Sequence, residues 1–205
     1  MLPSDHDGTV ILGKRKRGKT TLLTQLLEDE PRVIIYDAKG DFVEPVECPP
    51  GIEPEFPRTG VFRGYVPTGN SPWEELEWSA YLASKLGNCV WVVDEFPDAL
   101  EDKDPGVWVK WAIRMGRKRG IRYILTYQRP QEGPRMATSQ ASDWYLHQTN
   151  EPNELLFIKQ SVSAEASLLV RGLGRGESVH VKDGNVVGIM RSHNPDAKRR
   201  KKDNG

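Results

Sequence analysis

Residues 13–20 constrain this chain more than any other segment, because their sequence Gly-Lys-Arg-Lys-Arg-Gly-Lys-Thr completes a GxxxxGK[ST] motif. An apolar stretch precedes the motif at residues 9–12, and leucines at helical spacing follow it. A loop of this sequence between a strand and a helix is typical of a P-loop, which binds the phosphates of a nucleoside triphosphate. The alternative is a basic glycine turn, which this strand and helix context disfavours.

The parts of the motif have separate tasks. Its glycines let backbone N–H groups surround phosphate oxygens, and the following helix adds its positive end. We expect Lys19 to reach the β- and γ-phosphates and the Thr20 hydroxyl to ligate Mg²⁺. The predicted nucleotide-binding residues are Gly13, Lys14, Arg15, Lys16, Arg17, Gly18, Lys19, Thr20 and Thr21.

Length and composition favour a single domain in a reducing compartment. A chain of 205 residues can bury one α/β core. Two cysteines, Cys48 and Cys89, offer neither a disulfide framework nor a metal-ligand spacing. No apolar run approaches the roughly 20 residues that cross a bilayer. We therefore expect an unsecreted protein without a transmembrane segment.

Charge is distributed unevenly although the formal net charge is zero. The first 100 residues hold 10 basic and 17 acidic side chains, and the remainder holds 19 basic and 12 acidic ones. Residues 110–135 contribute eight lysines and arginines against one acid, and residues 198–202 form a second basic run. Such clustering is typical of a polyanion-binding protein, although a solvated face and a disordered tail remain an alternative.

The order of sequence patterns predicts a three-layer α/β/α P-loop domain over residues 1–192, with a mainly parallel central sheet. Strands are expected at 32–36, 89–93 and 121–126, and helices at 72–86 and through 108–115. Turn residues at 182–185 predict a C-terminal β-hairpin. Residues 43–72, with seven prolines and four glycines, are expected to be an irregular excursion rather than part of the sheet, and residues 193–205 a basic, disordered tail.

Asp94 and Glu95 end the apolar run Cys-Val-Trp-Val-Val, which is typical of a strand buried on both faces. Ligands of open α/β sheets bind at the carboxyl ends of such strands. Hydrolysis of a triphosphate needs a metal ion and a group that activates water. We therefore expect Asp94 to hold the Mg²⁺ shell and Glu95 to polarise the attacking water.

The sequence lacks the Asn-Lys-x-Asp motif that reads guanine in GTPases. Consecutive Asp and Glu residues also favour water activation over transfer to a small acceptor. Hydrolysis of ATP coupled to motion is therefore the preferred interpretation, and a small-molecule kinase is the weaker one.

Four stretches resemble the FtsK/HerA class of P-loop translocases, ring motors that move double-stranded DNA. They are the P-loop with its strand, the segment Trp-Val-Val-Asp-Glu-Phe at 91–96, the segment Tyr-Asp-Ala-Lys-Gly-Asp at 36–41, and residues 115–130 with their terminal Gln-Arg-Pro. The similarity covers most of residues 8–190. It implies ATP and Mg²⁺ as cofactors and a homo-oligomeric ring, hexameric or pentameric.

The resemblance also implies two further catalytic residues. Gln128 matches the polar sensor that follows the fourth core strand and contacts the γ-phosphate or the water. Arg117 matches the arginine that reaches the neighbouring subunit's nucleotide, which would make turnover depend on the ring. Three other arginines compete for that second role: Arg114, Arg119 and Arg129.

The small size of the chain resembles the genome-packaging ATPases of tailless, membrane-containing icosahedral viruses. This resemblance implies packaging of double-stranded DNA into a preformed capsid, with the ring in the host cytoplasm and at the capsid vertex, near capsid or membrane-associated viral proteins. A plasmid-transfer or phage-assembly ATPase is an alternative within the class. A slow nucleotide-dependent switch or scaffold is the alternative from another class.

Overall fold

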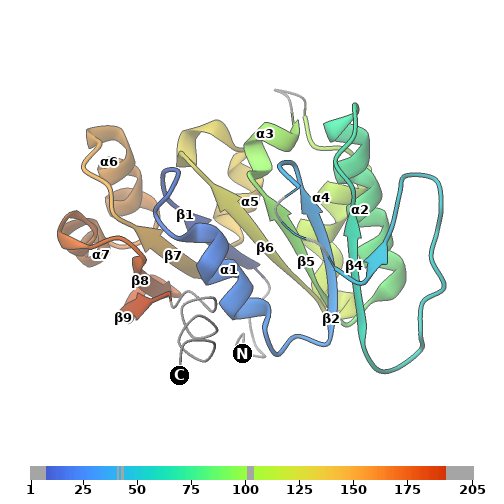
Figure 1. The fold of residues 1–205 in the computed structure, drawn as a ribbon. Helices are drawn as coiled ribbons and strands as arrows, with labels where there is room; N and C mark the ends of the chain where they lie inside the picture. The colour runs from blue at the N-terminus through green and yellow to red at the C-terminus, as the bar shows by residue number, and fades with distance from the viewer. Residues whose placement is uncertain (1–7, 41, 43, 101–103, 193–205) are drawn as a thin grey trace, which may run out of the picture.

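The protein is built around a nine-stranded sheet in the part of the chain that a computed structural model describes, residues 8–40, 42, 44–100 and 104–192 (Figure 1). The strand order is β3-β4-β2-β5-β6-β1-β7-β8-β9. Residues 1–7 and the predicted basic tail at 193–205 lie outside the described residues. The strands are β1 (Gly8–Leu12), β2 (Arg32–Asp37), β3 (Val46–Glu47), β4 (Phe62–Val66), β5 (Cys89–Asp94), β6 (Ile121–Tyr127), β7 (Asp143–His147), β8 (Glu177–Lys182) and β9 (Asn185–Arg191).

The first seven strands in this order, β3 through β7, pair in parallel with their neighbours. Strand β8 pairs antiparallel with β7, and β9 pairs antiparallel with β8. The helices are α1 (Lys19–Leu27), α2 (Pro72–Leu86), α3 (Phe96–Leu100), α4 (Val107–Met115), α5 (Arg135–Ser139), α6 (Pro152–Ser161) and α7 (Ala164–Leu169). Short 3₁₀ turns are η1 (Gly116–Arg119), η2 (Pro130–Glu132) and η3 (Val170–Gly172).

Helices cover both faces of the sheet, as Figure 1 shows. Leucines of α1 pack on one face, against alternate residues of the central strands such as Val90 and Val92. Helices α2, α4, α6 and α7 pack on the other face, which receives Trp91 and Val93. Strand β5 is therefore apolar on both sides because both sides are buried. The predicted α/β/α class is confirmed.

Most elements that depend on local patterns lie where the sequence predicts them. The predicted strands at 32–36, 89–93 and 121–126 correspond to β2, β5 and β6, and the predicted helices to α2 and α4. The C-terminal hairpin is also confirmed, as β8 and β9, with Asp183 and Gly184 at positive φ in its turn.

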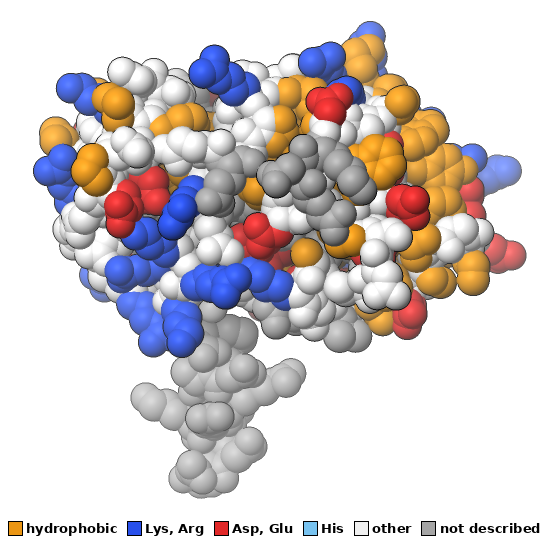
Figure 2. Space-filling view, turned by 90° about the horizontal axis from the view of Figure 1, so that it is seen from above, with side chains coloured by type: hydrophobic (Ala, Val, Ile, Leu, Met, Phe, Trp, Pro, Cys, Tyr) orange, Lys and Arg blue, Asp and Glu red, His pale blue; other side chains and the backbone are white. Residues whose placement is uncertain are grey.

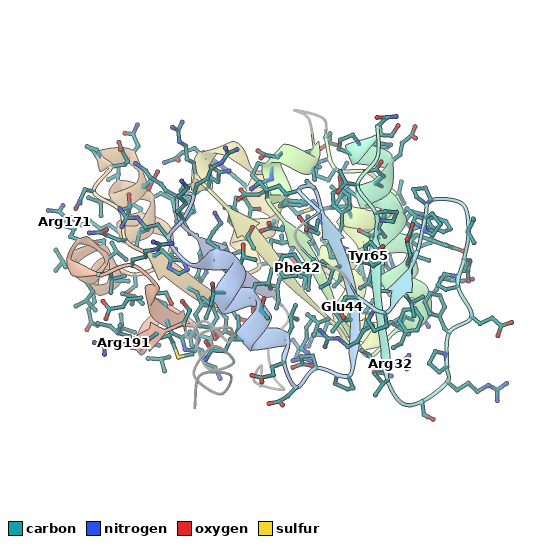
Figure 3. All side chains as sticks on the ribbon, in the orientation of Figure 1. Arg32, Phe42, Glu44, Tyr65, Arg171 and Arg191 are labelled. Atoms are coloured by element: carbon teal, nitrogen blue, oxygen red, sulfur yellow. The ribbon has the colours of Figure 1, made fainter. Side chains whose placement is uncertain are left out.

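The prediction that residues 43–72 lie outside the sheet is wrong for β3 and β4. Strand β4 pairs in parallel with β2 along its whole length and buries Phe62 and Val66. Gly64 is required there because an added Cβ would lie 2.9 Å from Cys48 Sγ. On the other face, Tyr65 and Phe42 both pack against the core that α1 covers, and Figure 3 labels both side chains. Flanking prolines and glycines hide this short edge strand in the sequence.

No helix in the described ranges combines the length and the hydrophobicity that crossing a bilayer requires.

His147 ends β7 and is buried beside the start of the P-loop. A Cβ on Gly13 would lie 2.7 Å from His147 Cβ, so the ring packs directly on that glycine. His147 Nδ1 lies 2.9 Å from the Glu177 carbonyl oxygen, which can only accept, so Nδ1 carries the proton. Nε2 is buried without a hydrogen-bond partner in the described structure. Burial, with Lys19 and Arg17 nearby, lowers the pKa of His147 from 6.5 to about 4.

We expect His147 to make folding stability depend on acid. The unfolded chain binds a proton below pH 6.5 and the folded chain only near pH 4, so stability falls as the pH drops between these values. The pKa difference corresponds to about 3 kcal/mol of lost unfolding free energy. Urea denaturation measures the unfolding free energy at pH 7 and pH 4. The decrease between these pH values should be smaller by this amount in His147→Asn than in the wild type, and the Asn amide can still donate to the Glu177 carbonyl. Equal losses in both proteins would contradict the assignment.

Candidate nucleotide-hydrolysing site

A pocket of about 800 Å³ opens at the carboxyl edge of the sheet, where β1, β2 and β5 end. Its lining includes seven of the nine predicted nucleotide-binding residues together with Asp94 and Glu95. The seven are Lys14, Arg15, Lys16, Gly18, Lys19, Thr20 and Thr21. The volume is within the range of small-molecule sites. The structure thus brings the P-loop and the acidic pair together, and their binding of phosphate remains a prediction.

The surface around this pocket is basic. Figure 2 views the carboxyl edge from above and shows lysine and arginine side chains gathered over the P-loop and the hairpin. Arg171 and Arg191 extend from the same end of the molecule in Figure 3, opposite Arg32. Hydrophobic side chains instead gather over the α2 and α4 end in Figure 2. Basic side chains therefore lie around the pocket that a triphosphate would enter.

Gly18 is the glycine of the loop that has a positive φ as well as a close neighbour. Its φ is +107°, and an added Cβ would lie 3.1 Å from the Gly176 Cα atom. Gly176 N–H donates to the Arg17 carbonyl at 3.0 Å, so the segment before β8 lies against the P-loop. At the other end of the loop, Gly13 N–H donates to the Tyr127 carbonyl at 3.0 Å. The loop is thereby attached to β6 and to the hairpin.

Lys19 is buried at the bottom of the pocket, with 6% of its surface exposed. Its Nζ donates to the Gly13 carbonyl at 2.7 Å and lies 3.2 Å from Glu95 Oε1. Thr20 follows on the first turn of α1 and lines the same pocket. The cation and the hydroxyl that the motif requires therefore face the acidic pair across one cavity.

Thr126 holds both acidic residues in place. Strands β5 and β6 are paired in parallel, which brings Thr126 beside Asp94 and Glu95. Its hydroxyl donates to Asp94 Oδ1 and accepts the Glu95 backbone N–H at 2.8 Å. Glu95 has a φ of +52°, a left-handed conformation that costs about 1–3 kcal/mol for a non-glycine residue. The surrounding contacts thus maintain a strained backbone that aims the Glu95 carboxylate into the pocket.

Burial and neighbouring charges shift the two carboxyl groups in opposite directions. Burial raises the pKa of Asp94, and the hydrogen bond from Thr126 opposes this only in part. Burial also favours the neutral form of Glu95, but the Lys39 hydrogen bond and the charge of Lys19 outweigh it and lower the pKa. Glu95 is therefore ionised although its side chain is almost fully buried.

The donors in the pocket fit Mg²⁺. Thr20 supplies a hydroxyl and Asp94 a carboxylate, both hard oxygen ligands that Mg²⁺ prefers. The described residues contain no cluster of three or more acidic, histidine or cysteine ligands, so this protein offers no dedicated metal cage there. Mg²⁺ sites of nucleotide-binding proteins use one or two protein ligands together with substrate phosphates, which matches this set.

Gln128 and Arg117 do not line the pocket, and their roles remain predictions. Gln128 is half-buried and directly follows Tyr127, whose carbonyl accepts from Gly13, so it lies beside the P-loop. Arg117 is exposed in η1, before β6 begins, and therefore lies at the amino edge of the sheet. Arg114 and Arg119 lie near Arg117, whereas Arg129 follows β6 at the carboxyl edge.

The structure adds pocket residues that the sequence did not indicate. Lys39 reaches Glu95 from the loop after β2, and Arg175 and Ser192 line the pocket from either side of the hairpin. Lys39 belongs to the Asp-Ala-Lys-Gly segment that resembles the FtsK/HerA pattern, which was its only signal. Arg175 and Ser192 carried none, because they meet the P-loop from more than 150 residues away.

Comparison with solved structures relates the chain by fold to a viral genome-packaging NTPase and to VirB4. No family model matches the sequence, and no curated protein matches it. The genome packaging NTPase B204 from Sulfolobus turreted icosahedral virus 2, in complex with AMPPCP, aligns with a TM-score of 0.72 and 21% identity, covering 94% of this chain and 100% of that one.

Two other solved structures also align with this chain over most of its length. B204, the DNA-packaging ATPase from Sulfolobus Turreted Icosahedral Virus, has a TM-score of 0.69 at 21% identity over 95% of this chain and 100% of that one. VirB4 of Thermoanaerobacter pseudethanolicus has a TM-score of 0.65 at 12% identity over 97% and 93%. The resemblance seen in the motifs is confirmed at the level of fold, which this chain shares with a viral genome-packaging NTPase and VirB4.

Proposed function

We propose that this protein hydrolyses ATP to ADP and phosphate and uses the energy to translocate double-stranded DNA, packaging a viral genome into a preformed capsid. The observation that carries the proposal is the convergence of Lys19, Thr20, Asp94 and Glu95 on one pocket at the carboxyl edge. Two segments about seventy residues apart in sequence meet there, as hydrolysis of a bound triphosphate requires. The shared fold with genome-packaging NTPases supports the choice of substrate and cargo.

The pocket residues divide the chemistry between them. Glu95 accepts a proton from water while the water oxygen attacks the γ-phosphorus and the bond to the ADP oxygen breaks. Lys19 stabilises the negative charge on the β- and γ-phosphate oxygens. Mg²⁺, held by Thr20 and Asp94, would neutralise further charge on the same oxygens. Gln128, beside the P-loop, orients the water or contacts the γ-phosphate.

The basic residues at 110–135 separate into two groups in the fold. Arg122 pairs with the buried Glu30, and Lys110 pairs with Asp104. The other six are exposed at the surface. They lie either before β6, at the amino edge of the sheet, or after β6: Arg114, Arg117, Lys118, Arg119, Arg129 and Arg135. In the proposed ring, these exposed cations serve duplex DNA and the contacts between subunits.

Replacement of Glu95 by Gln tests the hydrolytic role. We expect kcat for ATP to fall by about 10²- to 10⁴-fold, because the amide cannot accept the proton of the water. ATP binding should persist, since Lys19 and the loop backbone remain. Phosphate release and equilibrium binding measure the two quantities, with the exposed Glu55→Gln as the matched control. Retention of most of the turnover would exclude Glu95 as the base.

Duplex DNA distinguishes a motor from a nucleotide switch. We expect double-stranded DNA to stimulate ATP hydrolysis. If the protein contacts six or more DNA phosphates, its affinity for DNA should fall by orders of magnitude between about 50 and 200 mM salt. Steady-state ATPase rates with and without a duplex, across salt concentrations, measure this. Tight nucleotide binding with a rate indifferent to DNA would favour the switch and contradict the motor.

Mixing of two inactive variants tests catalysis shared between subunits. We expect Arg117→Ala and Glu95→Gln to be inactive alone and to recover part of the activity when mixed, because a mixed interface unites an intact Glu95 with an intact Arg117. The specific activity of the wild type should also rise with protein concentration. Arg114, Arg119 and Arg129, changed to Ala in the same way, serve as comparisons. Absence of recovery with Arg117, and recovery with one of these, would reassign the role.

A further inference from the structure

Glu95 shares one carboxylate oxygen between two lysines. Its Oε1 lies 2.6 Å from Lys39 Nζ and 3.2 Å from Lys19 Nζ. All three side chains line the nucleotide pocket. Two ammonium groups on one carboxylate oxygen occupy the positions from which that oxygen could accept a hydrogen bond from water. The proposed base is therefore restrained by the same cations that a phosphate would attract.

The loop that carries Lys39 is built to bring it there. Strands β2 and β5 pair in register, with Asp37 beside Asp94, so the residues that follow each strand are neighbours. The buried Asp37 carboxylate accepts the backbone N–H groups of Lys39 at 2.9 Å and Phe42 at 2.8 Å. Gly40 closes the turn at a φ of +72°. The position of Lys39 therefore follows from sheet register and from a capped turn.

The side chains of Lys39 and Glu95 differ in how far burial restricts their movement. Glu95 is buried and fixed through its backbone N–H to Thr126, with only 4% of its side chain exposed. The Lys39 side chain is 31% exposed and reaches Glu95 from the mouth of the pocket. If this ion pair breaks, the Lys39 ammonium group is therefore the part that moves, and the Glu95 carboxylate stays in place.

We propose that Lys39 is a second triphosphate-binding cation that passes from Glu95 to the γ-phosphate when nucleotide binds, which frees Glu95 to accept a proton from water. A γ-phosphate carries more negative charge than one carboxylate and offers several acceptor oxygens, so it competes for Lys39 and for Lys19. ADP lacks this group and leaves the Lys39 ion pair in place. The pair thereby prevents base action until a complete triphosphate is present. This inference rests on the proposed ATP hydrolysis.

Binding of AMPPCP and ADP, each with Mg²⁺, to three variants tests the contact with the γ-phosphate. Lys39→Met is expected to weaken AMPPCP binding by about 10-fold, the value of one charge-assisted hydrogen bond, with ADP binding within about twofold of wild type. Lys39→Arg should retain most of the affinity for AMPPCP. Lys85→Met is the matched control, since it removes a surface lysine that pairs with Glu53 away from the pocket. Equal weakening of both nucleotides, or of neither, would overturn the proposal.

A double-mutant cycle tests the exchange of partners. Glu95→Gln should tighten AMPPCP binding, because the phosphate no longer competes with a carboxylate for Lys39. The effect of Lys39→Met should then be larger in the Glu95→Gln background than in the wild type. A lysine that stays on Glu95 in the bound state would give the opposite order and overturn the proposal. Thermal unfolding of each variant verifies that the fold is intact, and Lys39→Arg supplies the readout if Lys39→Met is unstable.

The same series separates this inference from the proposed function. A wild type that discriminates AMPPCP from ADP through Lys39, but releases no phosphate from ATP, would refute hydrolysis and leave the cation contact established. A wild type that hydrolyses ATP while Lys39→Met leaves the preference for AMPPCP unchanged would refute the role of Lys39 and leave hydrolysis standing. A wild type that binds neither nucleotide would refute both.

Discussion

The burial of two carboxylates, those of Asp94 and Glu95, at the end of an apolar strand is the constraint on which the site depends. Both residues are at most 3% exposed, and removing an ionised group from water costs several kcal/mol. Neighbours must offset this cost. Thr126 on β6 bonds to both residues, while Lys19 and Lys39 come from the P-loop and the loop after β2. The parallel register that aligns three strand ends is therefore as necessary to the site as the motifs themselves.

The C-terminal hairpin belongs to the same site, although it lies at the edge of the sheet. Its segment before β8 packs against Gly18, where an added Cβ would lie 3.1 Å from the Gly176 Cα atom, and Ser192 after β9 crowds both glycines. His147 links Gly13 to the Glu177 carbonyl on β8 by packing on one side and a hydrogen bond on the other. The hairpin is therefore linked to both ends of the P-loop, directly at Gly18 and through His147 at Gly13.

The parts of the structure that sequence could predict are those whose signals are local. The P-loop, β5 with its acidic pair, and the hairpin turn each carry their own pattern within a few residues, and the fold confirms those elements. Strand β4 was missed because its five residues gain their place only by pairing with β2, while the surrounding prolines and glycines suggest a loop. Lys39 and Arg175 were missed as pocket residues for a related reason. Their positions follow from strand register and close packing between distant segments, which no periodicity records.

The location of the arginines limits how copies of this protein could share catalysis. Arg117 precedes β6 and the P-loop lies beyond its far end, so the seven residues of that strand place roughly 23 Å between the amino edge and the pocket. An arginine side chain cannot span that distance within its own chain. Participation of Arg117 in hydrolysis therefore requires the amino edge of one copy to face the carboxyl edge of the next. Such a contact joins two different surfaces, and heterologous contacts of this kind close into rings or extend into filaments rather than forming twofold dimers. Arg129, at the carboxyl edge, imposes no such requirement, so the identity of the catalytic arginine and the geometry of the assembly are one question.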